Sequence, residues 1–523
     1  MEKLMLQEVV QAVGGRLLQN PSSGADNSFS DANNAASDAG NTSASAYDVS
    51  TDTEILSVVT DSRKITPGCV FFALAGDRFD GHAYVQAALE KGAAGCVVMR
   101  EPQEYLPGKF YILVPDTRRA LGDLAHYYRM KFDVCVVGIT GSVGKTTCRE
   151  MVETVLSRHF KVHATAGNFN NDIGLPMTIF GLSGEHQVLV LEMGMNHPGE
   201  ISRLSQIAAP DIAVITNIGT AHIGNLGSRE NIFLAKKEIF DGMKSGAKAV
   251  LCGDDDFLPR IARDPSLLAR YHIFFAGKSG ICSYRVRDAH VEIREAGGNG
   301  DVSGVPDFYR SGHDASMTTV CRLRMPDRTG GIGKEMELRI PAVGMHLVYP
   351  ASIAAAVGDL LGMSFEEIRE GIADFAGQRM ACEQYGDILL FDDTYNASPD
   401  SMKSSLQVLA CLPAARKAAV LGDMLEQGEY AEDLHREVGA AAAEAGIDTL
   451  LTIGPLSVSM AEEARRCGLE DVREFPDRDS AAAAVEEITQ PGTALLFKAS
   501  HGLALDRLAA VSRRKAESIL AER

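Results

Sequence analysis

A glycine-rich run with one lysine, GITGSVGKTT at residues 138–147, carries the clearest chemical signal in the chain. It follows the β-branched apolar run of residues 134–138 and precedes apolar residues at helical spacing between 145 and 160. At such a strand-to-helix junction, backbone N–H groups can turn onto phosphate oxygens, a lysine can bridge the outer phosphates and a threonine hydroxyl can bind Mg²⁺. The alternative is an ordinary turn that contains Gly and Lys. The context favours a nucleotide site formed by Gly141, Ser142, Val143, Gly144, Lys145, Thr146 and Thr147.

Two further side chains follow strands that should lie beside this loop. Glu192 closes the apolar run 188–192, and His222 follows the run 212–217. Ligands of parallel α/β sheets bind at the C-terminal ends of strands, so both side chains can reach the crevice that holds the phosphates. A carboxylate there would complete the oxygen shell of Mg²⁺, and an imidazole could bind a second ion. A structural, hydrogen-bonded role for His222 fits its spacing equally well.

Two loops are dense in groups that suit sugar or peptide ligands. The first, NFNNDIGLP at residues 168–176, offers three asparagine side chains. The second, DDTYNASPDS at residues 392–401, follows an apolar run, and its Pro399 is placed to open a helix. Either loop could instead be a turn-rich connection. The position of the second loop after a strand favours a ligand there.

The elements that must position these residues fall into three units. In the first, residues 6–13 have helical spacing and end at Gly14, and apolar strands follow at 55–59, 70–74 and 96–99 with a helix at 82–91. Within this unit, residues 20–53 are rich in Ser, Asn, Ala, Asp and Gly. Such a composition cannot bury enough apolar surface to offset its ordering entropy, which predicts a mobile surface insertion.

The second and third units alternate strands with helices, the pattern of parallel α/β sheets. In the second unit, residues 284–293 and 335–340 alternate polar and apolar types, which predicts an added hairpin or small antiparallel sheet. The third unit has apolar strands at residues 388–391, 418–421, 449–453 and 494–497. The sequence therefore predicts an α/β protein of three domains: a small α/β N-terminal domain at 1–108, a central P-loop parallel-sheet domain of ATPase type at 109–377 and a Rossmann-like domain at 378–523.

Composition narrows the class of protein. The 523 residues are 45% hydrophobic and 23% charged, as in ordinary globular proteins of several domains. A formal net charge of −19 disfavours binding to nucleic acid or anionic membranes, so local cations must hold any anionic substrate. The 10 cysteines lack a CxxC pair and fit neither a disulfide framework nor a zinc site. No spanning helix or signal-peptide core is visible, which predicts a cytoplasmic protein without membrane insertion.

Together these segments resemble the Mur ligases of peptidoglycan synthesis, and most of all the members that add D-alanyl-D-alanine. The similarity covers nearly the whole chain outside residues 20–53. Besides the phosphate loop it rests on TDSR at 60–63, GDRFDGH at 76–82, NFNNDIGLP at 168–176, EMGMNHPGE at 192–200, TNIGTAH at 216–222, DDTYNASPDSM at 392–402 and LGDMLE at 421–426.

The resemblance implies an ATP-dependent amide-bond ligase of three domains. The first domain would hold the UDP part of a UDP-N-acetylmuramoyl-tripeptide, the second ATP with Mg²⁺, and the third D-alanyl-D-alanine. The reaction would pass through an acyl phosphate formed on the tripeptide. Such a protein would be a monomer that acts in cell-wall biogenesis, and so in cell shape, cell division and the cell cycle.

The resemblance also assigns roles to single residues. Lys145, His222 and Lys236 would serve catalysis, and Lys236 matches a lysine that related ligases carbamylate, although a solvated helix lysine is the commoner fate of this residue type. Arg379 and Asp393 would reach ATP from the third domain. The metal ligands would be Thr146, Glu192 and His222. The remaining substrate contacts would come from Ser62, Arg63, Asn168, Asn170, Asn171, Asn396, Asp400, Ser401 and Lys498.

The chain departs from the family pattern at four places. Ile139 stands where the commoner phosphate-loop spacing has its first glycine, and GMHLVYPAS at residues 344–352 replaces an Asn-rich stretch that serves adenine recognition. KASHG at residues 498–502 replaces KGSRG and loses an arginine, and Ser398 stands where Asn is common.

Two rival interpretations remain open. A sister ligase would share the phosphate loop, but the DNPR run of the ligase that adds the third peptide residue is absent here, and folylpolyglutamate synthase usually lacks the first domain. A regulatory or partition-type P-loop ATPase would need only the central unit. That interpretation leaves residues 55–100 and 380–523 unexplained.

Overall fold

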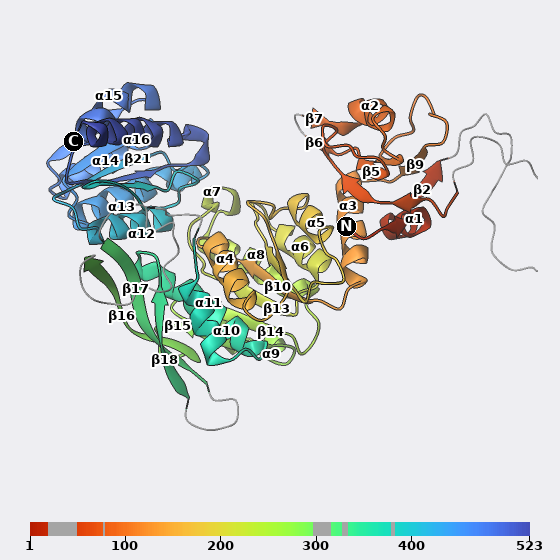
Figure 1. Ribbon diagram of the computed structural model, residues 1–523, viewed down its shortest axis with the longest axis horizontal. Coiled ribbons are helices and arrows are strands. Elements are labelled where there is room, and N and C mark those ends of the chain that lie inside the picture. Colours follow the sequence, from red (N-terminus) through yellow and green to blue (C-terminus); the bar gives the residue numbers. More distant parts are fainter. Residues whose placement is uncertain (19–49, 77–78, 296–314, 327–332, 378–381, 523) are drawn as a thin grey trace, which may run out of the picture. The chain divides into compact units, whose positions relative to one another are not determined.

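The computed structural model describes residues 1–18, 50–76, 79–295, 315–326, 333–377 and 382–522. The chain divides into two compact units. One comprises Met1–Val134, Thr165–His186 and Gln206–Ala208, and the other Cys135–Ala164, Gln187–Ser205 and Ala209–Arg523. Figure 1 labels many of the helices and strands of both units. The insertion predicted at residues 20–53 lies almost wholly outside the described residues.

The first unit is built on a five-stranded sheet with the order β2-β9-β8-β5-β4, in which only β2 runs antiparallel to its neighbour. Its strands are β2 (Arg16–Leu18), β4 (Ser57–Val59), β5 (Cys69–Phe72), β8 (Gly95–Val98) and β9 (Phe110–Leu113). Two short pairs accompany it, β1 (Leu4–Met5) with β3 (Glu54–Ile55) and β6 (Ala75–Gly76) with β7 (Phe79–Asp80). The helices are α1 (Leu6–Val13), η1 (Gly81–Tyr84), α2 (Val85–Glu90), α3 (Thr117–Met130) and α5 (Gly174–Ile179). The predicted first helix is confirmed, and it ends at Gly14 with φ 59°, a left-handed conformation that glycine adopts at little cost.

The second unit contains a nine-stranded sheet with the order β11-β12-β10-β13-β14-β15-β16-β17-β18. The strands from β11 to β16 are parallel, and β17 and β18 are antiparallel. Their bounds are β10 (Cys135–Thr140), β11 (Val162–Ala164), β12 (Val188–Glu192), β13 (Ile212–Ile215), β14 (Lys248–Cys252), β15 (His272–Gly277), β16 (Tyr284–Glu295), β17 (Ala315–Met325) and β18 (Lys334–Ile340). The helices of this part of the chain are α4 (Lys145–Leu156), α6 (Glu200–Ala208), α7 (Ile223–Leu226), α8 (Arg229–Lys237), η2 (Glu238–Gly242), η3 (Leu258–Arg263), α9 (Pro265–Leu268), η5 (Met345–Leu347), α10 (Val348–Leu360) and α11 (Phe365–Ala373).

The antiparallel extension of this sheet was predicted only in part. Strands do occupy residues 284–293 and 335–340, but each pairs with β17, which the sequence analysis did not predict. In β17, buried Leu323 and Met325 alternate with exposed Arg322 and Arg324. This alternation with a period of two is a signal that could have identified the strand.

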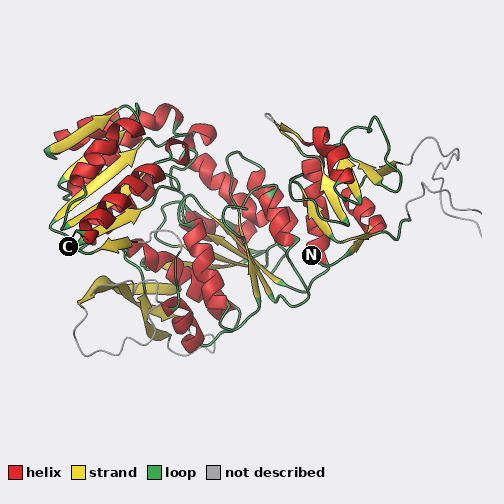
Figure 2. Cartoon of the chain, turned by 45° about the horizontal axis from the view of Figure 1, so that its top comes forward, coloured by secondary structure: helices red, strands yellow, loops and turns green. Residues whose placement is uncertain are grey.

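A six-stranded sheet with the order β19-β20-β24-β21-β22-β23 completes the second unit, and only β19 is antiparallel. Its strands are β19 (Cys382–Tyr385), β20 (Ile388–Asp392), β21 (Arg416–Gly422), β22 (Thr449–Ile453), β23 (Asp471–Phe475) and β24 (Thr493–Lys498). Its helices are α12 (Pro399–Cys411), η6 (Gly428–Tyr430), α13 (Ala431–Glu444), α14 (Val458–Arg466), α15 (Arg478–Ile488), η7 (His501–Leu503) and α16 (Asp506–Ala521). Helices flank the strands of this sheet on both sides (Figure 2).

The four apolar strands predicted for this sheet are confirmed, and α12 begins at Pro399 as predicted. The two edge strands, β19 and β23, were missed because most of their residues are polar and partly exposed. The α/β class, with parallel sheets covered by helices, is confirmed.

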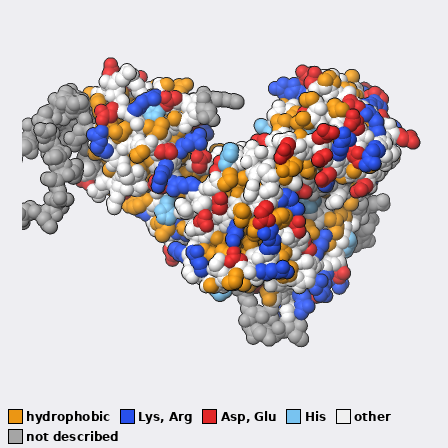
Figure 3. All heavy atoms as spheres, turned by 180° about the vertical axis from the view of Figure 1, so that it is seen from behind, with side chains coloured by type: hydrophobic (Ala, Val, Ile, Leu, Met, Phe, Trp, Pro, Cys, Tyr) orange, Lys and Arg blue, Asp and Glu red, His pale blue; other side chains and the backbone are white. Residues whose placement is uncertain are grey.

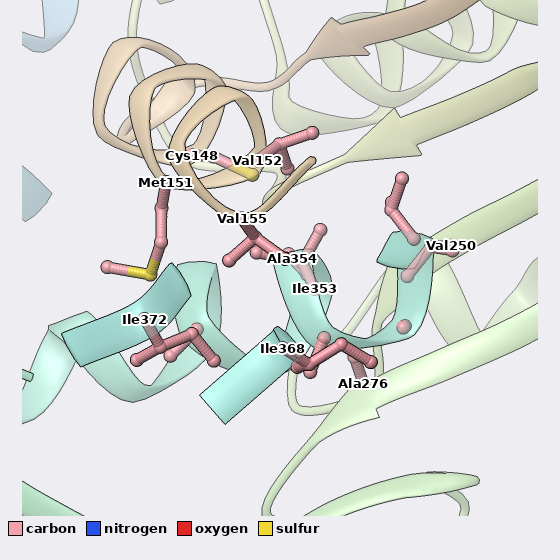
Figure 4. Close-up of a cluster of buried hydrophobic side chains, with 14 of the residues drawn as sticks. Cys148, Met151, Val152, Val155, Val250, Ala276, Ile353, Ala354, Ile368 and Ile372 are labelled. Carbon is pink, nitrogen blue, oxygen red and sulfur yellow. The ribbon is translucent and has the colours of Figure 1, made fainter. Parts of the chain in front are cut away.

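The helix that follows the phosphate loop is anchored by an apolar face. Side chains of α4, among them Cys148, Met151 and Val155, are fully buried. They lie against α10 and α11, from which Ile353 and Ile372 project toward them (Figure 4). Because burial of one such aliphatic side chain contributes about 1.5–3 kcal/mol, this packing fixes the start of α4 relative to the sheet. The helix ends at Leu156, four residues before the predicted end.

Candidate active site

The phosphate loop connects β10 to α4 through two glycines in conformations that favour glycine. Gly141 has φ 152°, and a Cβ at this position would lie 1.8 Å from Thr216 Oγ1. Gly144 has φ 77° and caps the start of α4. The loop therefore leaves the first backbone N–H groups of α4 without helical acceptors, at the end of the helix that carries partial positive charge. This is the arrangement that the sequence predicts for an anion site.

The loop is held against the chain that follows β13. The N–H groups of Ser142 and Val143 donate to the backbone and side-chain oxygens of Asn217, at 3.1 and 3.0 Å. In return, Thr216 Oγ1 donates to the Val143 carbonyl at 2.7 Å, and the Gly219 N–H donates to Ser142 Oγ at 2.9 Å. The TNIGTAH run thus sets the shape of the phosphate loop.

Lys145, Thr146 and Glu192 lie around this loop as the sequence predicts. Lys145 Nζ donates to the carbonyls of Gly141 and Ser142 at 2.9 and 3.3 Å. Glu192, the last residue of β12, is 2% exposed, and its Oε2 accepts from Thr146 Oγ1 at 2.9 Å. Two buried oxygen donors side by side suit Mg²⁺, which prefers oxygen ligands and usually keeps several waters and phosphate oxygens. Within the described ranges no group of three or more His, Cys, Asp or Glu could hold a metal alone.

Lys236 is a buried lysine of α8, not the solvated one that residue type alone would favour. It is 2% exposed, and no hydrogen bond or ion pair joins its side-chain amine to another residue that the structure describes. Its burial, together with the positive charge of Lys145, lowers the pKa of Lys236 well below the ordinary value. A buried amine whose charged form is disfavoured therefore lies within electrostatic range of Lys145.

His222 begins α7 with φ 62°, a conformation uncommon for residues other than glycine. Its Nδ1 lies 2.8 Å from Glu426 Oε2. Burial and the positive charge of Lys145 lower the pKa of His222, and the carboxylate of Glu426 acts in the opposite direction. His222 thus belongs to the same electrostatic environment as Lys145 and Lys236.

Two residues that the sequence analysis did not single out hold the loop between β13 and α7. Asp255 accepts from the N–H groups of Ile218, Phe257 and Leu258 at 2.7, 2.8 and 2.8 Å, and its burial raises the pKa of the carboxyl group. Arg229 Nη2 donates to the Ile218 carbonyl at 2.7 Å. Neither contact has a local sequence signal, because both join separate loops.

Asp393 and Lys498 form a buried pair at the C-terminal edge of the six-stranded sheet. Lys498 Nζ lies 2.6 Å from Asp393 Oδ2 and donates to the Asn396 carbonyl at 2.9 Å. Ser405 Oγ also donates to Asp393 Oδ2, at 2.7 Å. His346 is close enough for both charges to act on it, and burial lowers its pKa to about 4.

The other predicted residues of the 392–401 loop make hydrogen bonds mostly within that loop. Asn396 Oδ1 accepts from the Ala397 N–H at 2.9 Å, and Ser401 Oγ accepts from the Ser398 N–H at 2.9 Å at the start of α12. Asp400 reaches further, because its Oδ2 accepts from the Thr220 N–H at 3.3 Å. The structure therefore brings the 392–401 loop to the turn that also shapes the phosphate loop. Arg379 lies outside the described residues.

The remaining predicted residues belong to the first unit. Arg63 pairs with Asp61 at 2.8 Å on an exposed loop, and the Ser62 carbonyl accepts from Lys91 Nζ at 3.2 Å. In the asparagine-rich run, the Asn170 N–H donates to the Asn168 carbonyl at 2.7 Å. Asn171 Oδ1 accepts from the Ile173 and Gly174 N–H groups at 3.2 and 2.8 Å, which caps the start of α5. These contacts account for the loop geometry without a ligand.

Basic and acidic side chains both occur across the described parts of the face drawn in Figure 3. Among the described residues, no helix is long and apolar enough to cross a membrane.

Three family models match consecutive parts of the chain. The Mur ligase family catalytic domain matches residues 54–129, the Mur ligase middle domain residues 139–358, and the Mur ligase glutamate ligase domain residues 378–501.

Curated proteins match over most of their length. The UDP-N-acetylmuramoyl-tripeptide–D-alanyl-D-alanine ligase of Bacillus subtilis is 35% identical over 461 residues, which are 87% of this chain and 93% of that protein. The protein of the same name from Escherichia coli is 34% identical over 411 residues, which are 78% and 83% of the two chains.

Solved structures of MurF ligases also match this chain over most of its length. A crystal structure of MurF from Acinetobacter baumannii superposes with a TM-score of 0.80 at 29% identity and covers 98% of this chain and 99% of that one. The MurF ligase of Thermotoga maritima in complex with ADP gives a TM-score of 0.73 at 26% identity, with 88% and 98% covered.

Proposed function

The chain belongs to the Mur ligase family, and from that premise we propose that it joins D-alanyl-D-alanine to a UDP-N-acetylmuramoyl-tripeptide with cleavage of ATP to ADP and phosphate. The reaction is a step of peptidoglycan precursor synthesis and so of cell-wall biogenesis. One observation carries the proposal. The phosphate loop between β10 and α4, with Lys145, Thr146 and buried Glu192 around it, occurs in a chain that matches such ligases over most of its length.

We propose that the loop binds the phosphates of ATP. Lys145 would exchange its carbonyl contacts for phosphate oxygens, and the N–H groups at the start of α4 would donate to the same anion. Thr146 and Glu192 supply oxygen donors that fit Mg²⁺. When bound, the ion offsets negative charge on the phosphates. Asp393, and with it Arg379, would approach ATP from the six-stranded sheet.

The chemistry follows from the weakness of a carboxylate as an electrophile. Its charge is delocalised, and direct attack by an amine would have to expel oxide. Transfer of the γ-phosphate to the terminal carboxylate of the tripeptide gives an acyl phosphate and ADP. The free amine of D-alanyl-D-alanine then attacks the carbonyl carbon, and phosphate leaves with one carboxylate oxygen. Lys145 lowers the repulsion between the two anions, so the protein contributes mainly position and electrostatic stabilisation.

Lys236 is a candidate for carbamylation. Its lowered pKa favours the neutral amine, and a neutral amine adds CO₂ to give a carbamate and one proton. The new anion would lie within range of Lys145 and could serve as a further metal ligand. We propose this role together with those of Glu192 and His222.

The substrates divide among three domains in this proposal. Residues 1–108 would bind the UDP part through Ser62 and Arg63, and residues 109–377 would bind ATP. The tripeptide would meet the asparagine-rich run, which contributes Asn168, Asn170 and Asn171. Residues 378–523 would bind the amino substrate near Asn396, Asp400, Ser401 and Lys498. We propose a monomer that acts in the cytoplasm, where ATP is supplied.

A ligation assay tests the proposal. Purified protein is mixed with ATP, MgCl₂, D-alanyl-D-alanine and a UDP-muramoyl-tripeptide whose third residue is either diaminopimelate or lysine. We expect ADP and the pentapeptide product in equal amounts, with one tripeptide preferred. ADP release that needs neither peptide would instead support a regulatory ATPase.

A further inference from the structure

The chain that follows β21 carries a glutamate that the proposed mechanism does not use. Oε2 of Glu426 lies 2.8 Å from Nδ1 of His222, although the two residues are 204 positions apart and follow strands of different sheets. Both have positive φ angles, 65° for Glu426 and 62° for His222. Among non-glycine residues such angles are uncommon, and strained conformations of this kind cluster at functional sites.

Backbone contacts hold the two loops together independently of this side-chain pair. The Gly224 N–H donates to the Glu426 carbonyl at 3.2 Å, and Tyr430 Oη donates to the Gly227 carbonyl at 2.8 Å. A Cβ on Gly224 would lie 2.7 Å from both the Glu426 carbonyl oxygen and the Gly428 nitrogen. The close approach therefore depends on glycine at 224, and the loop would stay docked if only the carboxylate were removed.

The carboxylate selects one form of the imidazole. An ionised carboxylate only accepts hydrogen bonds, so Nδ1 must carry the proton that joins His222 to Glu426. In a neutral ring the other nitrogen, Nε2, is then an acceptor. No residue that the structure describes is hydrogen-bonded to Nε2, and the charges of Lys145 and Lys236 act on this ring. Nε2 is thus an acceptor without a hydrogen-bond partner among the described residues, on a ring that the charges of Lys145 and Lys236 reach.

We propose that Glu426 is a positioning residue for His222: its carboxylate holds the imidazole in the Nδ1–H tautomer and keeps Nε2 as an acceptor for the ATP site. Outer carboxylates that orient a ligand histidine in this way are a recurring device of metal sites. The inference rests on the proposed function and extends it, because a loop of the six-stranded sheet then completes a site on the nine-stranded sheet.

Kinetics of three variants test the role. Glu426→Ala removes the acceptor, and Glu426→Gln keeps a carbonyl that can accept from Nδ1–H. Glu429→Gln is the control: it makes the same charge change on a nearby exposed glutamate whose side chain has no described hydrogen-bond or ion-pair partner. We expect Glu426→Ala to lower kcat about 10–100-fold, with the KM for the tripeptide little changed. Glu426→Gln should recover most of the activity, and Glu429→Gln should match the unaltered protein. Unchanged kcat in Glu426→Ala, or an equal loss in Glu429→Gln, would overturn the proposal.

The tautomer itself can be measured without turnover. In protein labelled with ¹⁵N-histidine, long-range ¹H–¹⁵N spectra at pH 8 separate protonated from unprotonated ring nitrogens, and His222→Gln assigns the signal. We expect Nδ1–H in the unaltered protein, in Glu426→Gln and in Tyr430→Phe, which loses only the docking contact to Gly227. In Glu426→Ala the population should move to Nε2–H, and an unchanged tautomer there would refute the positioning role.

Failure of the unaltered protein to form the amide would reject the proposed function, whereas the tautomer measurement would still decide the role of Glu426.

Discussion

Two buried lysines show how neighbouring groups decide what a charged side chain can do. Lys236 on α8 and Lys498 at the end of β24 are each 2% exposed. The Lys498 amine lies 2.6 Å from the Asp393 carboxylate, whereas the Lys236 amine has no hydrogen bond or ion pair to another described residue. Burial of a cation is costly unless it is paired, so burial lowers the pKa of Lys236 well below its ordinary value.

The difference separates a charge that a neighbouring side chain balances from a buried amine without such a balance among the described residues. At the edge of the six-stranded sheet, Asp393 also accepts from Ser405, and Lys498 also donates to the Asn396 carbonyl, so the charges are neutralised within the protein. At the edge of the nine-stranded sheet, Lys145 lies over backbone carbonyls and acts on Lys236 and His222. The second edge is therefore arranged to receive an anion, as the proposed binding of ATP requires.

Removal of the phosphate-loop lysine should have the largest effect. Lys145→Ala takes away the cation that we propose faces the transferred phosphate, and we expect kcat/KM for ATP to fall about 10²–10³-fold, the usual cost of losing one such group. The free energy of unfolding should change little. Steady-state kinetics and urea denaturation measure the two quantities.

Lys248→Ala is the matched control. Lys248 Nζ also donates to a carbonyl, that of Leu360 at 3.0 Å, but it stands at the first residue of β14, at the opposite end of the strands. We expect near-normal kinetics. An equal loss of activity in both variants would mean that the phosphate loop is misassigned.

Disruption of the completed pair should cost stability. Asp393→Asn leaves Lys498 buried without a carboxylate, and we expect the free energy of unfolding to fall by about 3 kcal/mol. The double variant Asp393→Asn with Lys498→Met removes both charges and should recover most of the loss. Chemical denaturation of the single and double variants measures this, and a single variant as stable as the parent would show that the pair is not an important part of the fold.

Replacement of Lys236 should raise the free energy of unfolding, whereas disruption of the Asp393–Lys498 pair should lower it. Lys236→Met removes a buried amine with a lowered pKa, so the unfolded chain binds more protons than the folded one between the folded-state pKa and the ordinary lysine value of 10.5. Folding of the parent at pH 7.5 is opposed by the cost of burying or deprotonating this amine, so the variant should be more stable than the parent at that pH. The gain should shrink as the pH rises toward the ordinary lysine pKa. We would measure unfolding in CO₂-free buffer, and a variant less stable than the parent at pH 7.5 would contradict the depressed pKa.

The fold could be predicted where the signal is local. Buried strands such as β12 and β22 are continuous apolar runs, and their bounds were predicted as the structure has them. The phosphate loop could be predicted for the same reason, because its glycines, lysine and flanking elements lie within one short segment. The edge strands β19 and β23 escaped prediction, since most of their residues are polar and partly exposed and no apolar run marks them.

The contacts that complete the site could not be predicted in this way. Lys498 and Asp393 are 105 residues apart, and His222 and Glu426 are 204 apart. Their partners depend on which strand ends the topology brings together, and neither period nor composition carries that information. The burial of Lys236 is a similar case, because helix α8 alone would favour an exposed lysine.

The path of one oxygen atom tests most directly whether the phosphate loop activates a carboxylate. The tripeptide is labelled with ¹⁸O in its terminal carboxylate and incubated with the protein, ATP, MgCl₂ and D-alanyl-D-alanine, and the released phosphate is examined by mass spectrometry. Formation of an acyl phosphate predicts one ¹⁸O atom in each phosphate and one in the new amide. Unlabelled phosphate would contradict activation of the carboxylate by ATP at this site.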